Sequence, residues 1–224
     1  MTTVYVGREG RISWEFNRRT RILDLQGSGS IPSYSPFYGE LPGWAALRDQ
    51  FQEVRIGHGI TRIGAYAFYP YDHGIYADMH APLRRVIFPP TLESIGCSAF
   101  RANGSLPIID LYGLPNLRSI EENAFASCFG AKAIDLGGCA RLEELHPRAF
   151  WGCDDLTYID LEDCHSLSRT TLRALRRETP PYIPIVMPDG RVWYDDAILD
   201  GQERECRVLL GGLRKMAFRR GQPL

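Results

Sequence analysis

The sequence predicts an α/β repeat solenoid dominated by short β-strands. Two motifs recur along the middle of the chain at a fixed spacing, which for most copies is 25 residues. The first motif is an Ala-Phe pair, found at residues 67–68, 99–100, 124–125 and 149–150. The second is an Ile-Asp-Leu triplet, found at residues 109–111, 134–136 and 159–161. A period of this length indicates stacked repeats, because one repeat cannot bury its apolar face without a neighbour.

The first 50 residues are predicted to cap the open end of this solenoid. Residues 11–16 and 21–25 alternate apolar and polar side chains around a short polar loop, residues 17–20, which indicates a β-hairpin. Residues 27–38 are rich in Gly, Ser and Pro and are expected to be a loop, and residues 44–50 to be one short helix.

Residues 51–178 are predicted to hold about five repeats, each with one strand. The strand segments are residues 51–56, 83–88, 106–111, 131–136 and 156–161. Alternation within each segment places its fourth and sixth residues inward and its third and fifth residues outward. A second apolar pair follows the strand in several repeats, as in Leu92 and Ile95. The last repeat is degenerate and contains a predicted helix around Leu172 and Leu175 that ends before Pro180.

Residues 179–224 are predicted to form a C-terminal cap or a small β unit. Residues 183–187 and 191–194 flank Pro188-Asp189-Gly190, a strong turn signal. A further strand is expected within residues 203–210, followed by a short basic stretch at residues 213–220. Because no aromatic side chains are interleaved with the basic residues in a nucleic-acid-binding pattern, we do not expect nucleic acid as a partner.

The six cysteines are predicted to be reduced and buried. Cys128 and Cys153 are one repeat apart, as are Cys139 and Cys164, so each pair falls in one column of the coil. No close C-x₂-C pair of the zinc-site kind is present, and the five histidines follow no ligand spacing. The sequence therefore predicts no metal and no cofactor.

The composition limits which kinds of partner and which cell compartments fit this sequence. The formal net charge is −1, so no global field draws the chain toward nucleic acid or an anionic membrane. No run of 18 apolar residues predicts a membrane span. No apolar stretch of the signal-peptide kind opens the sequence, which predicts a cytoplasmic protein as written, or a cell-surface or secreted one if a leader has been removed.

Several motifs resemble a known bacterial family, the BspA-like leucine-rich-repeat proteins. The unit Ile-Gly-x-x-Ala-Phe-x-x-Cys is approached at residues 63–68, 95–100 and 121–128, and Ser13-Trp14-Glu15-Phe16, Gly27-Ser28-Gly29 and Pro42-Gly43-Trp44 resemble the family's N-terminal cap. The resemblance covers residues 7–178 and implies a right-handed leucine-rich-repeat coil. It also implies a surface or secreted adhesion module that binds other proteins, with no catalytic residues to transfer. Residues 181–224 resemble nothing familiar.

We therefore expect a non-enzymatic module that binds another protein through its repeat surface. Nucleophile-elbow, H-E-x-x-H and Walker motifs are absent from the sequence. Two features are candidates for the contact: the outward strand positions, with three aspartates in one column, and a seven-residue excess within residues 69–82 that is rich in tyrosine. The predicted partner-binding residues are Arg55, Tyr69, Tyr71, Tyr76, Arg85, Asp110, Asp135, Tyr158 and Asp160. The alternatives are that the aspartates are consensus residues in water and that the insertion folds back onto its own repeat.

Two other functions stay open at this point. One is a cytoplasmic inhibitor or immunity-type protein, or an effector delivered into a host cell. The scarcity of lysine, with only Lys132 and Lys215, fits delivery but also fits GC-rich coding. The more remote one is an enzyme activity seated in the C-terminal segment. The sequence predicts no oligomeric state.

Overall fold

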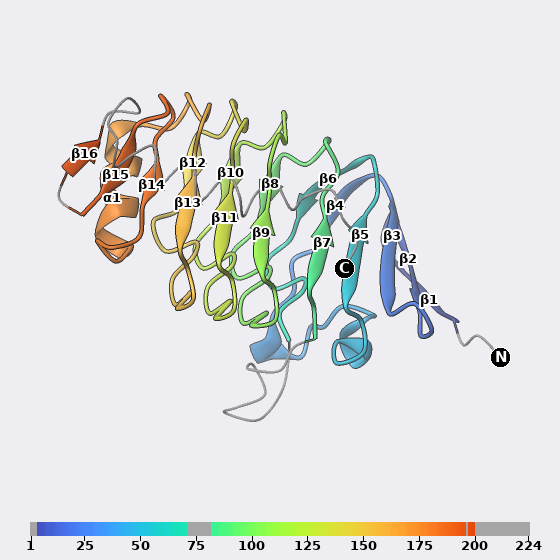
Figure 1. The fold of residues 1–224 in the computed structure, drawn as a ribbon. Coiled ribbons are helices and arrows are strands. Elements are labelled where there is room, and N and C mark those ends of the chain that lie inside the picture. Colours follow the sequence, from blue (N-terminus) through green and yellow to red (C-terminus); the bar gives the residue numbers. More distant parts are fainter. Residues whose placement is uncertain (1–3, 71–81, 196, 200–224) are drawn as a thin grey trace.

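Two ladders of parallel strands wind through the molecule and enclose one apolar core (Figure 1). The structure, a computed structural model, describes residues 4–70, 82–195 and 197–199. The predicted repeat solenoid is confirmed. The predicted division at residues 50 and 178 stays a prediction.

The first ladder carries the strands expected from the repeated motifs. Its repeat strands are β5 (Glu53–Ile56), β7 (Arg85–Ile87), β9 (Ile108–Asp110), β11 (Ala133–Asp135) and β13 (Tyr158–Asp160). β5 pairs in parallel with β7, and β11 pairs in parallel with both β9 and β13. The inward positions are buried as predicted in β5, β9, β11 and β13, for example Ile109, Ile134 and Ile159.

The first ladder is divided between β7 and β9, which belong to two different sheets. The division coincides with a change in the turn that follows each strand. The apolar residues that bracket this turn are seven positions apart in residues 56–63 and 88–95, but nine apart in residues 111–120 and 136–145.

The second ladder consists of very short strands on the opposite side of the core. They are β4 (Gly29–Ile31), β6 (Ile60–Ile63), β8 (Ser94–Ile95), β10 (Ser119–Ile120) and β12 (Glu144–Leu145), paired in that order and all in parallel. The loop predicted for residues 27–38 is therefore wrong at Gly29–Ile31, because these residues pair with β6 and add a rung to the ladder.

The Ala-Phe motif builds a column of stacked rings inside the coil. Phe68, Phe100, Phe125 and Phe150 stack on one another with ring centroids 4.9, 5.1 and 6.0 Å apart. Trp44 continues the column at its N-terminal end, with its ring 5.5 Å from that of Phe68. The motif repeats because every rung supplies one ring to this column.

The predicted N-terminal hairpin is confirmed as β2 (Ile12–Asn17) and β3 (Ile22–Gly27), which pair antiparallel. β3 pairs in parallel with β5, so the hairpin is part of the first ladder. An additional strand, β1 (Val4–Glu9), pairs antiparallel with β2. Two 3₁₀ turns follow, at Pro36–Tyr38 and Ala45–Leu47, and the second stands where a short helix was predicted.

The C-terminal end of the described coil is closed by a helix and a small antiparallel extension. Ser168 is the N-cap of α1 (Arg169–Glu178), and its Oγ accepts a hydrogen bond from the Thr171 N–H at 3.0 Å. β14 (Ile185–Val186) adds to the ladder in parallel with β13, and β15 (Val192–Tyr194) and β16 (Ala197–Leu199) follow antiparallel. The hairpin around Pro188-Asp189-Gly190 is thus confirmed. The strand and basic stretch predicted within residues 203–220 lie outside the described residues.

The predicted burial is confirmed for the four cysteines of the two columns, whereas Cys97 is half-buried and Cys206 lies outside the described residues. Cys128, Cys139, Cys153 and Cys164 are free and buried. Each Sγ donates a hydrogen bond to a backbone carbonyl of the preceding repeat, as in Cys139 to Leu111 at 3.1 Å and Cys164 to Leu136 at 3.1 Å. Burial is the main cause that raises the pKa of Cys139 to about 11 and that of Cys153 to about 12. These thiols stay protonated, and their role is to pack in the buried core.

Candidate protein-binding surface

The outward side chains of the first ladder form two columns, each interrupted at the ladder division between β7 and β9. The third position of successive repeat strands gives one column, made up of Glu53, Arg85, Ile108, Ala133 and Tyr158. The fifth position gives the other, made up of Arg55, Ile87, Asp110, Asp135 and Asp160. Register pairing of Asp135 with both Asp110 and Asp160 confirms the predicted column of three aspartates.

In the half of this surface formed by β5, β7 and β9, five of the six outward side chains are exposed and Glu53 is half-buried. We call its outward residues the open ladder face, which comprises Glu53, Arg55, Arg85, Ile87, Ile108 and Asp110. Two of its side chains are apolar: Ile87 is 37% exposed and Ile108 is 43% exposed. They stand on successive repeat strands, one on each side of the ladder division. Both are branched apolar side chains at outward strand positions, which makes them candidates for a contact surface.

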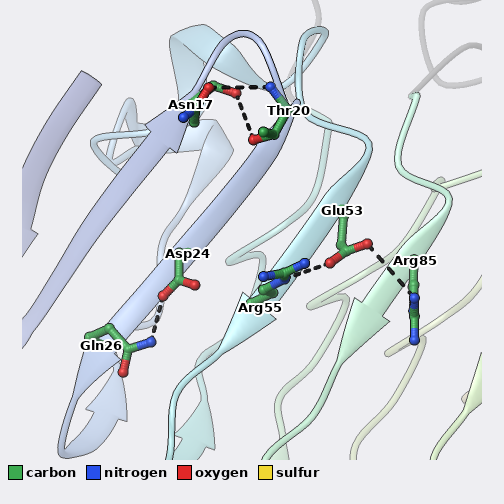
Figure 2. A network of polar contacts seen from close by, with 7 residues as sticks. All are labelled: Asn17, Thr20, Asp24, Gln26, Glu53, Arg55 and Arg85. Atoms are coloured by element: carbon green, nitrogen blue, oxygen red, sulfur yellow. Dashed lines mark hydrogen bonds and ion pairs between the residues drawn. The ribbon is translucent and has the colours of Figure 1, made fainter. Parts of the chain in front are cut away.

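Charged side chains of both signs gather on β3, β5 and β7 (Figure 2), and one of them, Arg55, is the register partner of Ile87. The Arg55 guanidinium pairs with the Glu53 carboxylate at 2.6 Å, and Arg85 approaches the other oxygen of the same carboxylate at 4.0 Å. On β3, Asp24 is the register partner of Arg55 and accepts a hydrogen bond from Gln26. Exposed ion pairs of this kind add little to stability, whereas they can orient an approaching partner.

The half formed by β11 and β13 is closed. Asp135 is only 1% exposed and Tyr158 only 4%, and Ala133 beside them is buried as well. The expected outward exposure is therefore wrong for these three residues, and Asp160 is half-buried. Asp135 Oδ1 accepts a hydrogen bond from the Gly137 N–H at 3.1 Å. Burial, followed by the nearby charges of Asp160 and Asp110, raises the pKa of Tyr158.

Alternation alone failed here because burial of an outward side chain depends on a second layer. Ala133 and Tyr158 form an apolar cluster with Val186 and Val192 of β14 and β15. The two valines come from the C-terminal extension, whose position relative to the repeats no periodic pattern encodes. As partner contacts, Asp135 and Tyr158 stay untested, but neither is displayed on the surface.

The tyrosine-rich insertion is described only at its start. Tyr69 is half-buried, packs against the core and has its ring 5.9 Å from that of Tyr66 in an edge-on arrangement. Tyr71 and Tyr76 lie outside the described residues, so their role stays a prediction. On the other side of the ladder division, Tyr112 is largely exposed and follows the end of β9.

Sequence reasoning overlooked Ile108 and Tyr112 as candidate contacts. A signal for Ile108 was present: it stands at a position predicted to face outward, where a large apolar side chain lacks a structural reason. For Tyr112 the sequence offers only a turn position, and its exposure follows from the tertiary structure.

Other site types are not found in the described part of the chain. Among those residues, no three His, Cys, Asp or Glu side chains gather closely enough to hold a metal ion. In the same ranges, no helix has the length and apolar character needed to cross a bilayer.

Comparisons with known proteins agree on the repeats. The family model for the BspA-type leucine-rich-repeat region matches residues 72–175 with six copies. A leucine-rich-repeat protein from Eubacterium ventriosum has a similar solved structure, with a TM-score of 0.50 and 17% identity, and the match covers 75% of this chain and 45% of that one. A leucine-rich cell surface protein from Faecalibacterium prausnitzii gives a TM-score of 0.50 with 16% identity, over 78% of this chain and 43% of that one.

The chain therefore spans less than half the length of both structures. At these identities the likeness concerns the fold alone. A comparison with curated proteins finds no match.

Proposed function

The chain carries leucine-rich repeats of the BspA type over residues 72–175, and on that premise we propose that it is a non-enzymatic module that binds another protein through its open ladder face. Repeat coils of this kind offer an extended regular surface. The observation that carries the proposal is the pair of exposed isoleucines, Ile87 and Ile108, on that surface between charged neighbours.

In many protein interfaces, apolar side chains supply affinity and charged side chains supply orientation, and this surface offers both. Ile87 and Ile108 can lose water-exposed apolar area when a partner binds, which supplies affinity. Arg55, Arg85 and Asp110 stand around them and provide charges of both signs, which supply orientation and rate of encounter. A partner that fits would present an apolar centre flanked by charges of both signs.

The proposal excludes the covered half of the column from the initial contact. Asp135 and Tyr158 are buried, so a partner that docks without rearranging this chain meets the open ladder face. Of the residues predicted from sequence, Arg55, Arg85 and Asp110 thus remain the central candidates, joined by Ile87 and Ile108.

A site-specific cross-linking experiment tests the proposal. A photoreactive amino acid replaces Ile108 in one variant and Glu144, an exposed residue on the second ladder, in a matched control. Both variants are illuminated in the native cell and in candidate host material, and the cross-linked proteins are identified by mass spectrometry. We expect a specific protein adduct from position 108 and none from position 144. The reverse pattern would place the binding surface on the other side of the coil.

A further inference from the structure

The coil is continuous on its other sides at the place where the first ladder is divided, between β7 and β9. The second ladder runs unbroken through β8 and β10 there, and the Glu121 N–H donates to the Ile95 carbonyl at 2.9 Å. Inside the coil, the rings of Phe100 and Phe125 stack across the same boundary. The two rungs are therefore joined in the core and on the far side, and strand pairing is missing on the side that carries the open ladder face.

A regular hydrogen bond is missing at this boundary because Pro107 has no N–H. Where the first ladder is continuous, the second residue of a strand segment donates its N–H to the carbonyl at the same position in the preceding rung. These bonds include Arg84 to Gln52 at 2.8 Å, Lys132 to Pro107 at 2.9 Å and Thr157 to Lys132 at 2.9 Å. Pro107 accepts from the following rung in this way, but it has no N–H to donate to the Arg84 carbonyl.

A second ladder bond is missing at the other end of the same strands. The sixth residue of a later segment donates its N–H to the carbonyl of the fifth residue in the following rung, as Leu111 does to Asp135 at 2.8 Å. The equivalent bond from Phe88 to Asp110, two residues that the structure describes, is not formed. The facing strands thus lack ladder hydrogen bonds at both of their ends.

We propose that the two strands that carry the exposed isoleucines move relative to each other, and that Pro107 is the positioning residue that keeps them unpaired. Ile87 lies on the last strand of one sheet and Ile108 on the first strand of the next. Strands without ladder bonds between them separate at a lower free-energy cost than paired strands. Asn116 limits the separation, because its Nδ2 donates to the Pro90 carbonyl at 2.9 Å and so joins the same two rungs just beyond the strands.

This movement makes the spacing of the two isoleucines adjustable. Outward side chains on paired strands stand at a fixed spacing of about 4.8 Å. A partner that contacts both Ile87 and Ile108 selects one spacing from the available range and thereby orders the two sheets relative to each other. The role of the movement in binding rests on the proposed function, whereas the movement itself is a property of this chain alone.

Amide hydrogen exchange measured by NMR tests whether the strands are unpaired. The amides of Phe88 and Leu111 occupy the same position in successive rungs, so they form a matched pair within one protein. We expect the Phe88 amide to exchange at least about 100-fold faster, because only the Leu111 amide is held in a ladder hydrogen bond. Similar exchange rates for the two amides would overturn the inference.

The substitution Pro107→Lys tests the role of the proline, since Lys132 occupies the same position in the next rung and donates the regular bond. It should slow exchange at Phe88 at least about tenfold and leave Leu111 unchanged. Pro90→Lys replaces an exposed proline of the turn after β7 and is the control, which should leave Phe88 exchanging fast. The assignment to Pro107 is overturned if its substitution leaves Phe88 fast or if the control slows Phe88 equally.

Electron paramagnetic resonance of paired spin labels tests the movement. Labels at positions 55 and 87 stand on paired strands, and labels at 87 and 110 stand at the same repeat position on either side of the division. They are attached to introduced cysteines in a chain with Cys97→Ser and Cys206→Ser, which leaves only the four buried native thiols.

We expect a wider distribution of distances between labels at 87 and 110 than between labels at 55 and 87, and Pro107→Lys should narrow it. Equally narrow distributions, or a wide one that Pro107→Lys leaves unchanged, would overturn the inference. Both measurements use the chain without a partner, so their outcome is independent of whether the open ladder face binds another protein.

Discussion

Phe100 and Phe125 stack with their ring centroids 5.1 Å apart and their planes only 5° from parallel, although a whole repeat separates them in sequence. Both rings are fully buried. This contact explains the most regular motif of the chain, because the Ala-Phe pair places one ring per rung in a continuous column. Stability of the coil should therefore depend strongly on the rings in the middle of the column.

Phe100→Ala should lower the free energy of unfolding by about 3–5 kcal/mol, because it removes a fully buried ring and leaves a cavity between two neighbours. Trp151→Ala is the matched control, since its side chain is largely exposed and its loss should change stability by about 0.5 kcal/mol or less. Urea denaturation followed by circular dichroism measures both. Equal effects of the two substitutions would show that the column does not hold the coil together.

Stability should fall as the pH rises above about 9. In the unfolded chain, thiols ionise near their ordinary pKa of about 8.5, whereas in the folded chain burial keeps Cys139 protonated to about pH 11 and Cys153 to about pH 12. The unfolded state alone loses these protons in that window, so each thiol should cost on the order of 1 kcal/mol per pH unit there. The double variant Cys139→Ala, Cys153→Ala should show a shallower decline. Identical slopes for both proteins between pH 8.5 and 10.5 would contradict the buried, protonated state.

Removing residues 1–50 should cause the remaining chain to aggregate or unfold. The deletion exposes the edge of β5 and takes away Trp44, which stacks on Phe68 and donates a hydrogen bond from Nε1 to the Ala67 carbonyl at 3.0 Å. Size-exclusion chromatography and thermal melting measure the outcome. A soluble fragment of residues 51–224 with a cooperative melt would show that the N-terminal segment is dispensable as a cap.

The charges of the open ladder face should control how fast a partner associates. Arg55→Gln combined with Arg85→Gln should slow association several-fold and weaken its dependence on salt, because exposed charges act mainly on the rate of encounter. Arg141→Gln combined with Arg148→Gln removes two other exposed arginines and serves as the control. Surface plasmon resonance at two ionic strengths measures the rates. Equal association rates for the two double variants would show that Arg55 and Arg85 do not control association.

Much of the fold could be predicted from sequence because each rung buries the same kinds of side chains at the same positions. The strands around Ile109, Ile134 and Ile159 and the Phe column follow from a fixed period. The second ladder could not be predicted in the same way, since strands such as Ser94–Ile95 contain too few residues to show alternation. β4 was hidden because its Gly and Ser residues are typical of loops, and it is a strand only because β6 lies beside it.

The candidate site was predictable only in part for a related reason. Repeat position tells which side chains point away from the core, and this holds for Arg55, Arg85 and Asp110. It does not tell which outward side chains are covered by a second layer, as Asp135 and Tyr158 are. That information depends on contacts between segments far apart in the chain, which leave no period in the sequence.

The most direct test of the central claim is the dissociation rate of the partner from a chain in which both exposed isoleucines of the open ladder face are replaced. With the partner identified by cross-linking, Ile87→Ser combined with Ile108→Ser should speed dissociation about tenfold or more, because truncating the apolar centre of an interface costs about 1–3 kcal/mol and acts mainly on the off-rate. Trp151→Ser removes a larger exposed apolar side chain elsewhere and should leave the rate unchanged. An unchanged dissociation rate in the isoleucine variant, with the folded structure retained, would contradict binding through the open ladder face.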